Sequence, residues 1–77
     1  MDPDANLEEQ LSLSWEIIEI IDERSDEDGN LSDDDKDELV DNANRLAELV
    51  TALNTWIRSG GFVPQAWAAG LQRAARR

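Results

Sequence analysis

The chain has 77 residues, of which 18 are acidic and 7 basic, and it contains neither cysteine nor histidine, so its formal net charge is −11. This length leaves room for one small domain, residues 1–77. Without Cys or His the chain has no disulfide framework, thiolate nucleophile, imidazole base or zinc-binding cluster. We therefore predict a single-domain protein that is not an enzyme and uses no cofactor.

No stretch of the sequence is apolar over the roughly 18 to 20 residues that span a bilayer. The N-terminal residues Met1-Asp2-Pro3-Asp4 are acidic, whereas a signal peptide begins with basic residues. The sequence therefore predicts a cytoplasmic protein with no membrane contact.

The charges are unevenly distributed along the chain. Residues 1–44 contain 17 acidic and two basic side chains, whereas residues 45–77 contain one acidic side chain and five arginines. This asymmetry favours one of two arrangements. Either the acidic half of one subunit binds the basic C-terminal part of another subunit, or an acidic surface binds a basic partner. The alternative is that the carboxylates serve only solubility.

The first helix is predicted over about residues 6–23, with Asn6 as its N-cap and Glu9 completing a capping box. One stripe on it recurs at spacings of four and three residues and is apolar apart from one serine: Leu7, Leu11, Ser14, Ile18 and Ile21. A second row beside this stripe consists of Leu13, Ile17 and Ile20, and Trp15 lies on its other side. Because the combined apolar arc is about twice as wide as one neighbouring helix can cover, we expect this helix to contact at least two others.

An acidic linker is predicted over residues 24–31, followed by a second helix over about residues 33–59. Ser32 is the expected N-cap, and the three aspartates that follow it favour the positive end of the helix dipole. The apolar stripe of this helix has an unbroken four-three spacing and consists of Leu39, Ala43, Leu46, Val50, Leu53 and Ile57. Gly60-Gly61 provides a left-handed residue that ends the helix.

A short third helix is predicted over about residues 64–75, with Pro64 in its first turn. Phe62 and Trp67 lie at the spacing of a hydrophobic staple, and Trp67 and Leu71 are expected to pack on the end of the first two helices. The predicted fold is all-α: a long antiparallel helical hairpin with the short third helix across its open end. Two wide apolar arcs exceed what this third helix can cover, so we expect a homodimer in which two hairpins form a helical bundle.

The linker between the first two helices partly fits an EF-hand calcium loop. With Gly29 as the sixth loop residue, the remaining ligand positions fall on oxygen-bearing side chains: Asp26, Asp28, Ser32 and Asp35. Arg24 occupies the first ligand position, where a carboxylate is required. We prefer the interpretation of an acidic turn with a helix cap, and a structural protein with a degenerate EF-hand-like metal loop is the alternative.

Carboxylates are denser between residues 22 and 41 than helix capping requires. The residues that we expect to contact a partner are Asp33, Asp34, Asp37 and Asp41, together with Trp15 at the edge of the first helix's apolar arc. The predicted function is therefore binding of a protein partner through an acidic helical surface. The alternative is a DNA mimic whose carboxylates imitate phosphates and occupy a nucleic-acid-binding protein, whereas direct nucleic-acid binding is not expected from so acidic a chain.

The second half of the chain contains a specific spacing of aromatic residues, glycine and proline. The residues concerned are Leu46-Ala47-Glu48-Leu49-Val50 and then Leu53, Trp56, Ile57, Gly60, Gly61, Phe62, Val63, Pro64 and Trp67. This segment resembles small acidic hypothetical proteins of actinobacteriophages, especially those of mycobacteria, in which a helix ends in Leu-x-x-Trp-[Ile/Leu]-x-x-Gly-Gly-Phe-[Leu/Val]-Pro-x-x-Trp. The resemblance covers residues 46–67 and implies a phage origin and a helical fold, but no activity. By analogy with other short phage proteins, it implies a host protein as the partner.

Overall fold

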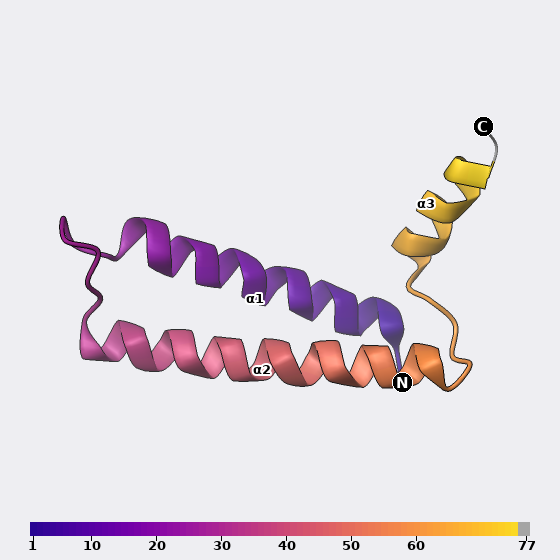
Figure 1. Ribbon diagram of the computed structural model, residues 1–77, viewed down its shortest axis with the longest axis horizontal. Coiled ribbons are helices and arrows are strands. Elements are labelled where there is room, and N and C mark those ends of the chain that lie inside the picture. Colours follow the sequence, from indigo (N-terminus) through magenta and orange to yellow (C-terminus); the bar gives the residue numbers. More distant parts are fainter. Residues whose placement is uncertain (76–77) are drawn as a thin grey trace.

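The computed structural model describes the backbone of residues 1–75 and the side chains of residues 1–70. Over these residues the chain forms three helices and no strand: α1 (Pro3–Glu23), α2 (Asp33–Arg58) and α3 (Gln65–Ala75). α1 and α2 run antiparallel and pack along their length, whereas α3 leaves the end of this hairpin and projects away from it (Figure 1). The predicted all-α hairpin with a short third helix is confirmed.

α1 begins at Pro3, so the predicted start at Asn6 is wrong. The Asp2 carboxylate accepts hydrogen bonds from the backbone N–H groups of Asp4 and Ala5, at 3.0 and 3.1 Å. Pro3 occupies the first helical position, where a missing N–H leaves no hydrogen bond unmade. This Asp-Pro cap lies upstream of Asn6 and leaves the Asn6 side chain free for another role.

Asn6 is buried between α1 and α2, where its Nδ2 donates a hydrogen bond to the backbone oxygen of Leu49 at 3.1 Å. Its Oδ1 accepts a hydrogen bond from Gln10 Nε2 at 2.6 Å. Both ends of the amide are therefore satisfied, which removes the usual penalty for burying a polar side chain. Asn6 ties the two helices together rather than capping one of them.

Both ends of α2 follow the sequence prediction. The Ser32 hydroxyl accepts a hydrogen bond from the Asp35 N–H at 3.1 Å at the start of the helix. At its end the N–H groups of Gly60 and Gly61 donate to the carbonyl oxygens of Ile57 and Trp56, at 3.1 and 2.9 Å. Gly60 has a φ of +92°, so this end is a Schellman motif with glycine in the left-handed position.

The row of α1 that faces α2 differs from the predicted stripe. Ile20 is only 1% exposed and Leu13 and Ile17 are half-buried, whereas Leu11 and Ile18 of the predicted stripe are 54% and 49% exposed. The buried row recurs at the same four-three spacing but is displaced from the predicted stripe by about a quarter of a turn, and it consists of Asn6, Gln10, Leu13, Ile17 and Ile20. Within the described residues α2 is the helix that packs along α1, so much of the wide apolar arc of α1 stays uncovered.

α2 faces α1 with a row that partly overlaps the predicted stripe. Leu49 and Leu53 are buried, and Leu39 and Leu46 are half-buried. Ala43 and Val50, both in the predicted stripe, are exposed, and the row continues instead through Asn42 and Leu49. The core of the hairpin is therefore narrow, because it has one layer of side chains from each helix.

Polar contacts cross the hairpin on one of its two faces. Arg45 forms two hydrogen bonds to Glu9, at 2.6 and 3.0 Å, and Asn42 donates to Glu16 at 3.2 Å. Glu9 and Glu16 flank the buried row of α1 on one side, and Leu11 and the rest of the predicted stripe flank it on the other. The apolar residues that α1 leaves exposed therefore lie on the hairpin face opposite these polar contacts.

The Glu9–Arg45 pair makes stability depend on pH with a definite sign. The hydrogen bond from Arg45, together with its charge, lowers the pKa of Glu9 below its ordinary value of 4.5. A carboxylate with a lowered folded-state pKa stabilises the fold above its unfolded-state pKa, and this contribution is lost as pH falls through the folded-state pKa. We expect Glu9→Gln to be less stable than the parent at pH 7 in urea unfolding, and the difference to vanish on acidification.

Glu8→Gln is the matched control, because it removes the same charge from an exposed neighbour that forms no ion pair among the described residues. We expect this variant to show no loss of stability at pH 7, since it only relieves repulsion in an acidic chain. Equal behaviour of the two variants would show that the pair contributes nothing.

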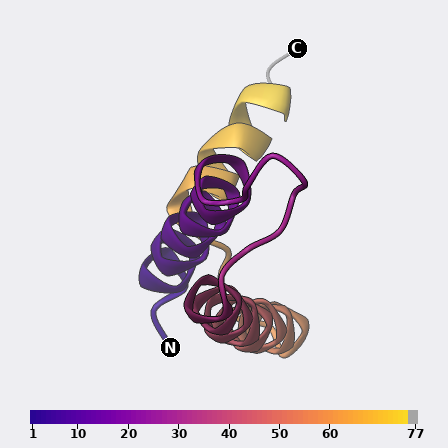
Figure 2. The ribbon, with the colours of Figure 1, turned by 90° about the vertical axis from the view of Figure 1, so that its left-hand side faces the viewer.

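α3 is attached to the hairpin mainly at its first residue. The Asp4 carboxylate accepts a hydrogen bond from the Gln65 N–H at 2.7 Å, and Pro3 and Pro64, the neighbours of these two residues, are both fully buried. Beyond this point α3 rises past the side of α1 (Figures 1 and 2). The expectation that α3 lies across the open end of the hairpin is therefore wrong: Trp67 is 44% exposed, and the side chain of Leu71 lies outside the described residues.

Candidate partner-binding surfaces

The linker does not gather the four predicted metal ligands. Asp26 Oδ1 instead accepts hydrogen bonds from the N–H groups of Asp28 and Asn30, both at 2.9 Å. Among the described residues, no group of three or more carboxylates could hold a metal ion. With Gly29 at a φ of +82°, the linker is an acidic turn closed by its own aspartate.

The other two predicted ligands also have structural partners. Ser32 caps α2, and Asp35 pairs with Arg24, whose Nη1 lies 3.2 Å from Asp35 Oδ1 and 2.6 Å from Glu38 Oε2. The hydrogen bonds with Glu38 and Asp35 raise the pKa of Arg24 above its ordinary value. Arg24, which breaks the calcium-loop pattern in the sequence, thus joins the end of α1 to the first turns of α2.

The four aspartates predicted to bind a partner lie on the outer surface of α2. All four are exposed, and none forms an ion pair within the part of the chain that the structure describes: Asp33, Asp34, Asp37 and Asp41. Asp33 and Asp37 lie near the middle of the helix surface that faces away from the row contacting α1, and Asp34 and Asp41 lie toward one edge of this surface. This surface is acidic.

Trp15 lies on a different surface from these aspartates. Its side chain is 71% exposed, and it falls on the side of α1 that faces away from α2. It borders a hollow of about 310 Å³ that is lined otherwise by one apolar and three acidic side chains: Ile18, Glu19, Asp22 and Glu23. The structure therefore separates Trp15 from the predicted aspartates and surrounds it with three other carboxylates.

These three carboxylates were missing from the predicted site, although their spacing provides a signal for two of them. Glu19 and Asp22 follow Trp15 by four and seven residues, which places them on the same helix surface. In the structure all three acids border the exposed tryptophan.

A second hollow, of about 220 Å³, lies between the hairpin and α3. It is lined by Gln10, Val50, Leu53, Asn54, Ile57 and Trp67. Gln10 and Val50 lie on the hairpin face opposite the Glu9–Arg45 pair, so this hollow opens onto the exposed apolar side. Trp67 thus lines one wall of an open groove.

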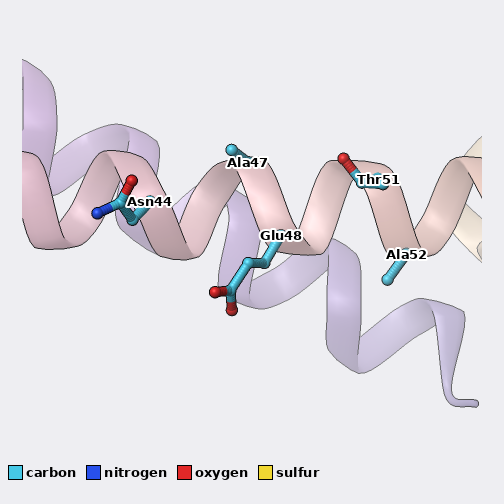
Figure 3. Close-up of a pocket in the computed structure, with 5 residues that line it drawn as sticks. All are labelled: Asn44, Ala47, Glu48, Thr51 and Ala52. Atoms are coloured by element: carbon cyan, nitrogen blue, oxygen red, sulfur yellow. The ribbon is translucent and has the colours of Figure 1, made fainter.

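A third hollow is a shallow depression on the outer surface of α2. Its five lining residues, Asn44 among them, come from one helix, and Figure 3 shows Ala47 and Thr51 on one side of it while Glu48 and Ala52 point the other way. These side chains do not converge on a common point, and they provide no nucleophile with an adjacent base. The depression results from short side chains and supports no catalytic role.

No family model, curated protein or solved structure matches this chain. None of the helices within the described residues is both long and apolar enough to cross a membrane.

Proposed function

We propose that this chain is a non-catalytic interaction protein that binds a basic segment of a protein partner. The observation that carries the proposal is the acid-bordered hollow around Trp15, a tryptophan that is 71% exposed. Exposed tryptophans are frequent anchors of protein interfaces, because a partner can cover a large rigid ring at low entropic cost.

The carboxylates around Trp15 determine the chemistry of the partner. Glu19, Asp22 and Glu23 surround the ring, and they complement a segment in which an apolar residue is flanked by lysine or arginine. The exposed aspartates on the outer surface of α2 add to the negative field, which attracts such a segment from a distance. The partner segment thus binds at the Trp15 hollow, and the wider acidic surface increases the rate at which it arrives there.

The resemblance to actinobacteriophage proteins supports a phage origin, and with it a host protein as the partner. We place the interaction in the cytoplasm of the infected bacterium. A phage protein of this size can act by occupying a surface that the host protein needs, without chemistry of its own.

Two triple variants test which acidic surface binds. One variant neutralises the border of the hollow, with the changes Glu19→Gln, Asp22→Asn and Glu23→Gln. The other neutralises the outer surface of α2, with the changes Asp33→Asn, Asp34→Asn and Asp37→Asn. Each variant removes three negative charges from exposed positions, so the two match in net charge and differ only in location.

We expect affinity capture from a mycobacterial lysate to recover a partner with the parent and with the α2 variant, although more weakly with the latter. Trp15→Ala and the hollow variant should lose it, by at least tenfold in affinity for the purified partner, which is about 1.4 kcal/mol. Loss with the α2 variant alone would move the site to the surface predicted from the sequence. A captured nucleic-acid-binding protein that added duplex DNA displaces would instead favour the DNA-mimic alternative.

A further inference from the structure

The solvent-accessible surface area of the chain is larger than that of a compact monomer of the same mass. Its accessible surface is 5891 Å², whereas a compact 8.6 kDa protein exposes about 4,700 Å². Its radius of gyration is 16.1 Å, against roughly 11.5 Å for a compact domain of this length. The excess of about 1,200 Å² is larger than the roughly 800 Å² that each partner buries in a standard interface.

Much of this surface belongs to one face of the hairpin, which we call the apolar face. Its exposed members are aliphatic residues of α1 and α2 and the tryptophan at the start of α3: Leu11, Ile18, Ile21, Val50 and Trp67. The opposite face carries the Glu9–Arg45 pair and the Asn42–Glu16 hydrogen bond, so it is already occupied by polar contacts. In a monomer the side chains of the apolar face are therefore about half exposed to solvent.

We propose that a second copy of this chain covers the apolar face, with the two hairpins antiparallel. The apolar face shares Ile18 with the Trp15 hollow, but the variants that test the two proposals are at different residues. The excess surface is large enough to bury against a second copy, and charge favours one direction: residues 22–38 have a net charge of −8, whereas residues 1–10 and 53–70, at the other end of the hairpin, contain four acids and one arginine, a net charge of −3. An antiparallel pair brings the strongly acidic linker end of each copy to the less acidic end of the other.

A parallel pair would bring the two acidic linker ends together, each with a net charge of −8. Repulsion between like charges of this density opposes that arrangement. The weaker repulsion in the antiparallel pair thus selects one of the two symmetric ways in which the apolar faces can meet.

The sequence of α1 fits an antiparallel contact with its own copy. The stripe beside the buried row is nearly symmetric about Ser14, with Leu7 and Leu11 on one side and Ile18 and Ile21 on the other; Leu7 and Ser14 are half-buried and the other three are exposed. Antiparallel α1 helices would then pack leucine against isoleucine on both sides, with a small residue at the centre. The Ser14 hydroxyl already donates to the Gln10 carbonyl oxygen at 2.8 Å, so covering Ser14 leaves no donor unsatisfied.

Sedimentation and light scattering test the association. At tens of micromolar we expect the parent to have twice the mass of an 8.6 kDa chain. Leu11→Asp should reduce it to a monomer that keeps its far-UV helical spectrum, because Leu11 contributes little to the core of one chain. Ser12→Asp, which adds the same charge to the adjacent exposed residue on the polar side of α1, should remain a dimer.

Single cysteines test the orientation, since the chain has none of its own. We expect Ser14→Cys to form a disulfide with its own copy, and Leu7→Cys to form one with Ile21→Cys when the two variants are mixed. A parent that stays monomeric at hundreds of micromolar would overturn the proposal. Crosslinking of Ile21→Cys to itself, with none at Ser14→Cys, would overturn the antiparallel arrangement.

Discussion

Replacing Ile20 with alanine is expected to lower the free energy of unfolding by about 2–5 kcal/mol. Ile20 is 1% exposed, and only Leu49 and Leu53 join it as buried hydrophobic residues of the described chain. The substitution removes three buried carbon atoms and leaves a cavity that two helices cannot collapse around. A core of this size supplies only about 3–5 kcal/mol in total, so the variant should be largely unfolded at room temperature.

Ile18→Ala is the matched control for this prediction. It makes the same chemical change two residues earlier in the same helix, at a side chain that is 49% exposed. In urea unfolding followed by far-UV circular dichroism at low protein concentration, where association is weakest, we expect Ile18→Ala to cost less than half as much as Ile20→Ala. Equal costs would mean that the stripe predicted from the sequence, and not the observed row, faces α2.

The helix ends predicted most accurately were those specified by local chemistry. Ser32 followed by aspartates specifies the start of α2, and Gly60-Gly61 specifies its Schellman end. Each signal involves residues within about five positions of one another, so it can be read without knowledge of the fold. The start of α1 carries an equally local signal in Asp2-Pro3, which lies just upstream of the capping-box pattern at Asn6.

The buried face of α1 could not be predicted from such local sequence signals. Its apolar arc contains two rows, and the more regular one is the row that the structure leaves exposed. The buried row includes Asn6 and Gln10, which appear unsuitable for a core until their hydrogen bonds to Leu49 and to each other are known. A partner 43 residues away decides this choice, and the periodicity of α1 alone contains no information about it.

The candidate site was likewise predictable from the sequence only in part. Trp15 at the edge of the apolar arc was predicted to be available to a partner, and it is 71% exposed. The sequence predicted it as a partner contact together with Asp33, Asp34 and Asp37. The structure places Trp15 and these aspartates on the outer surfaces of different helices, so their distance along the chain did not indicate their separation in space.

Gly61→Ala is expected to displace the Trp56 ring and to destabilise the end of the hairpin. A Cβ atom at position 61 would lie 2.3 Å from one atom of this ring and 2.5 Å from two others, well inside van der Waals contact. The ring is held by a hydrogen bond from its Nε1 to the Phe62 carbonyl oxygen at 3.0 Å and by an edge contact with the Phe62 ring, whose centroid is 5.6 Å away. Moving it breaks both interactions, and overpacking of this kind typically costs about 1–3 kcal/mol.

Gly60→Ala separates this steric effect from backbone strain. Gly60 has a φ of +92° but no atom within 4 Å of a Cβ built on it, so alanine there meets only the left-handed penalty of about 1–2 kcal/mol. The three tryptophan indole N–H resonances, assigned with single Trp→Phe variants, distinguish the two cases because only Trp56 among the described side chains donates its indole N–H to a backbone oxygen. We expect the Trp56 resonance to shift and exchange rapidly with solvent in Gly61→Ala but to stay in place in Gly60→Ala. An unchanged Trp56 resonance in Gly61→Ala would show that the ring does not pack on Gly61, and that this glycine serves the chain turn alone.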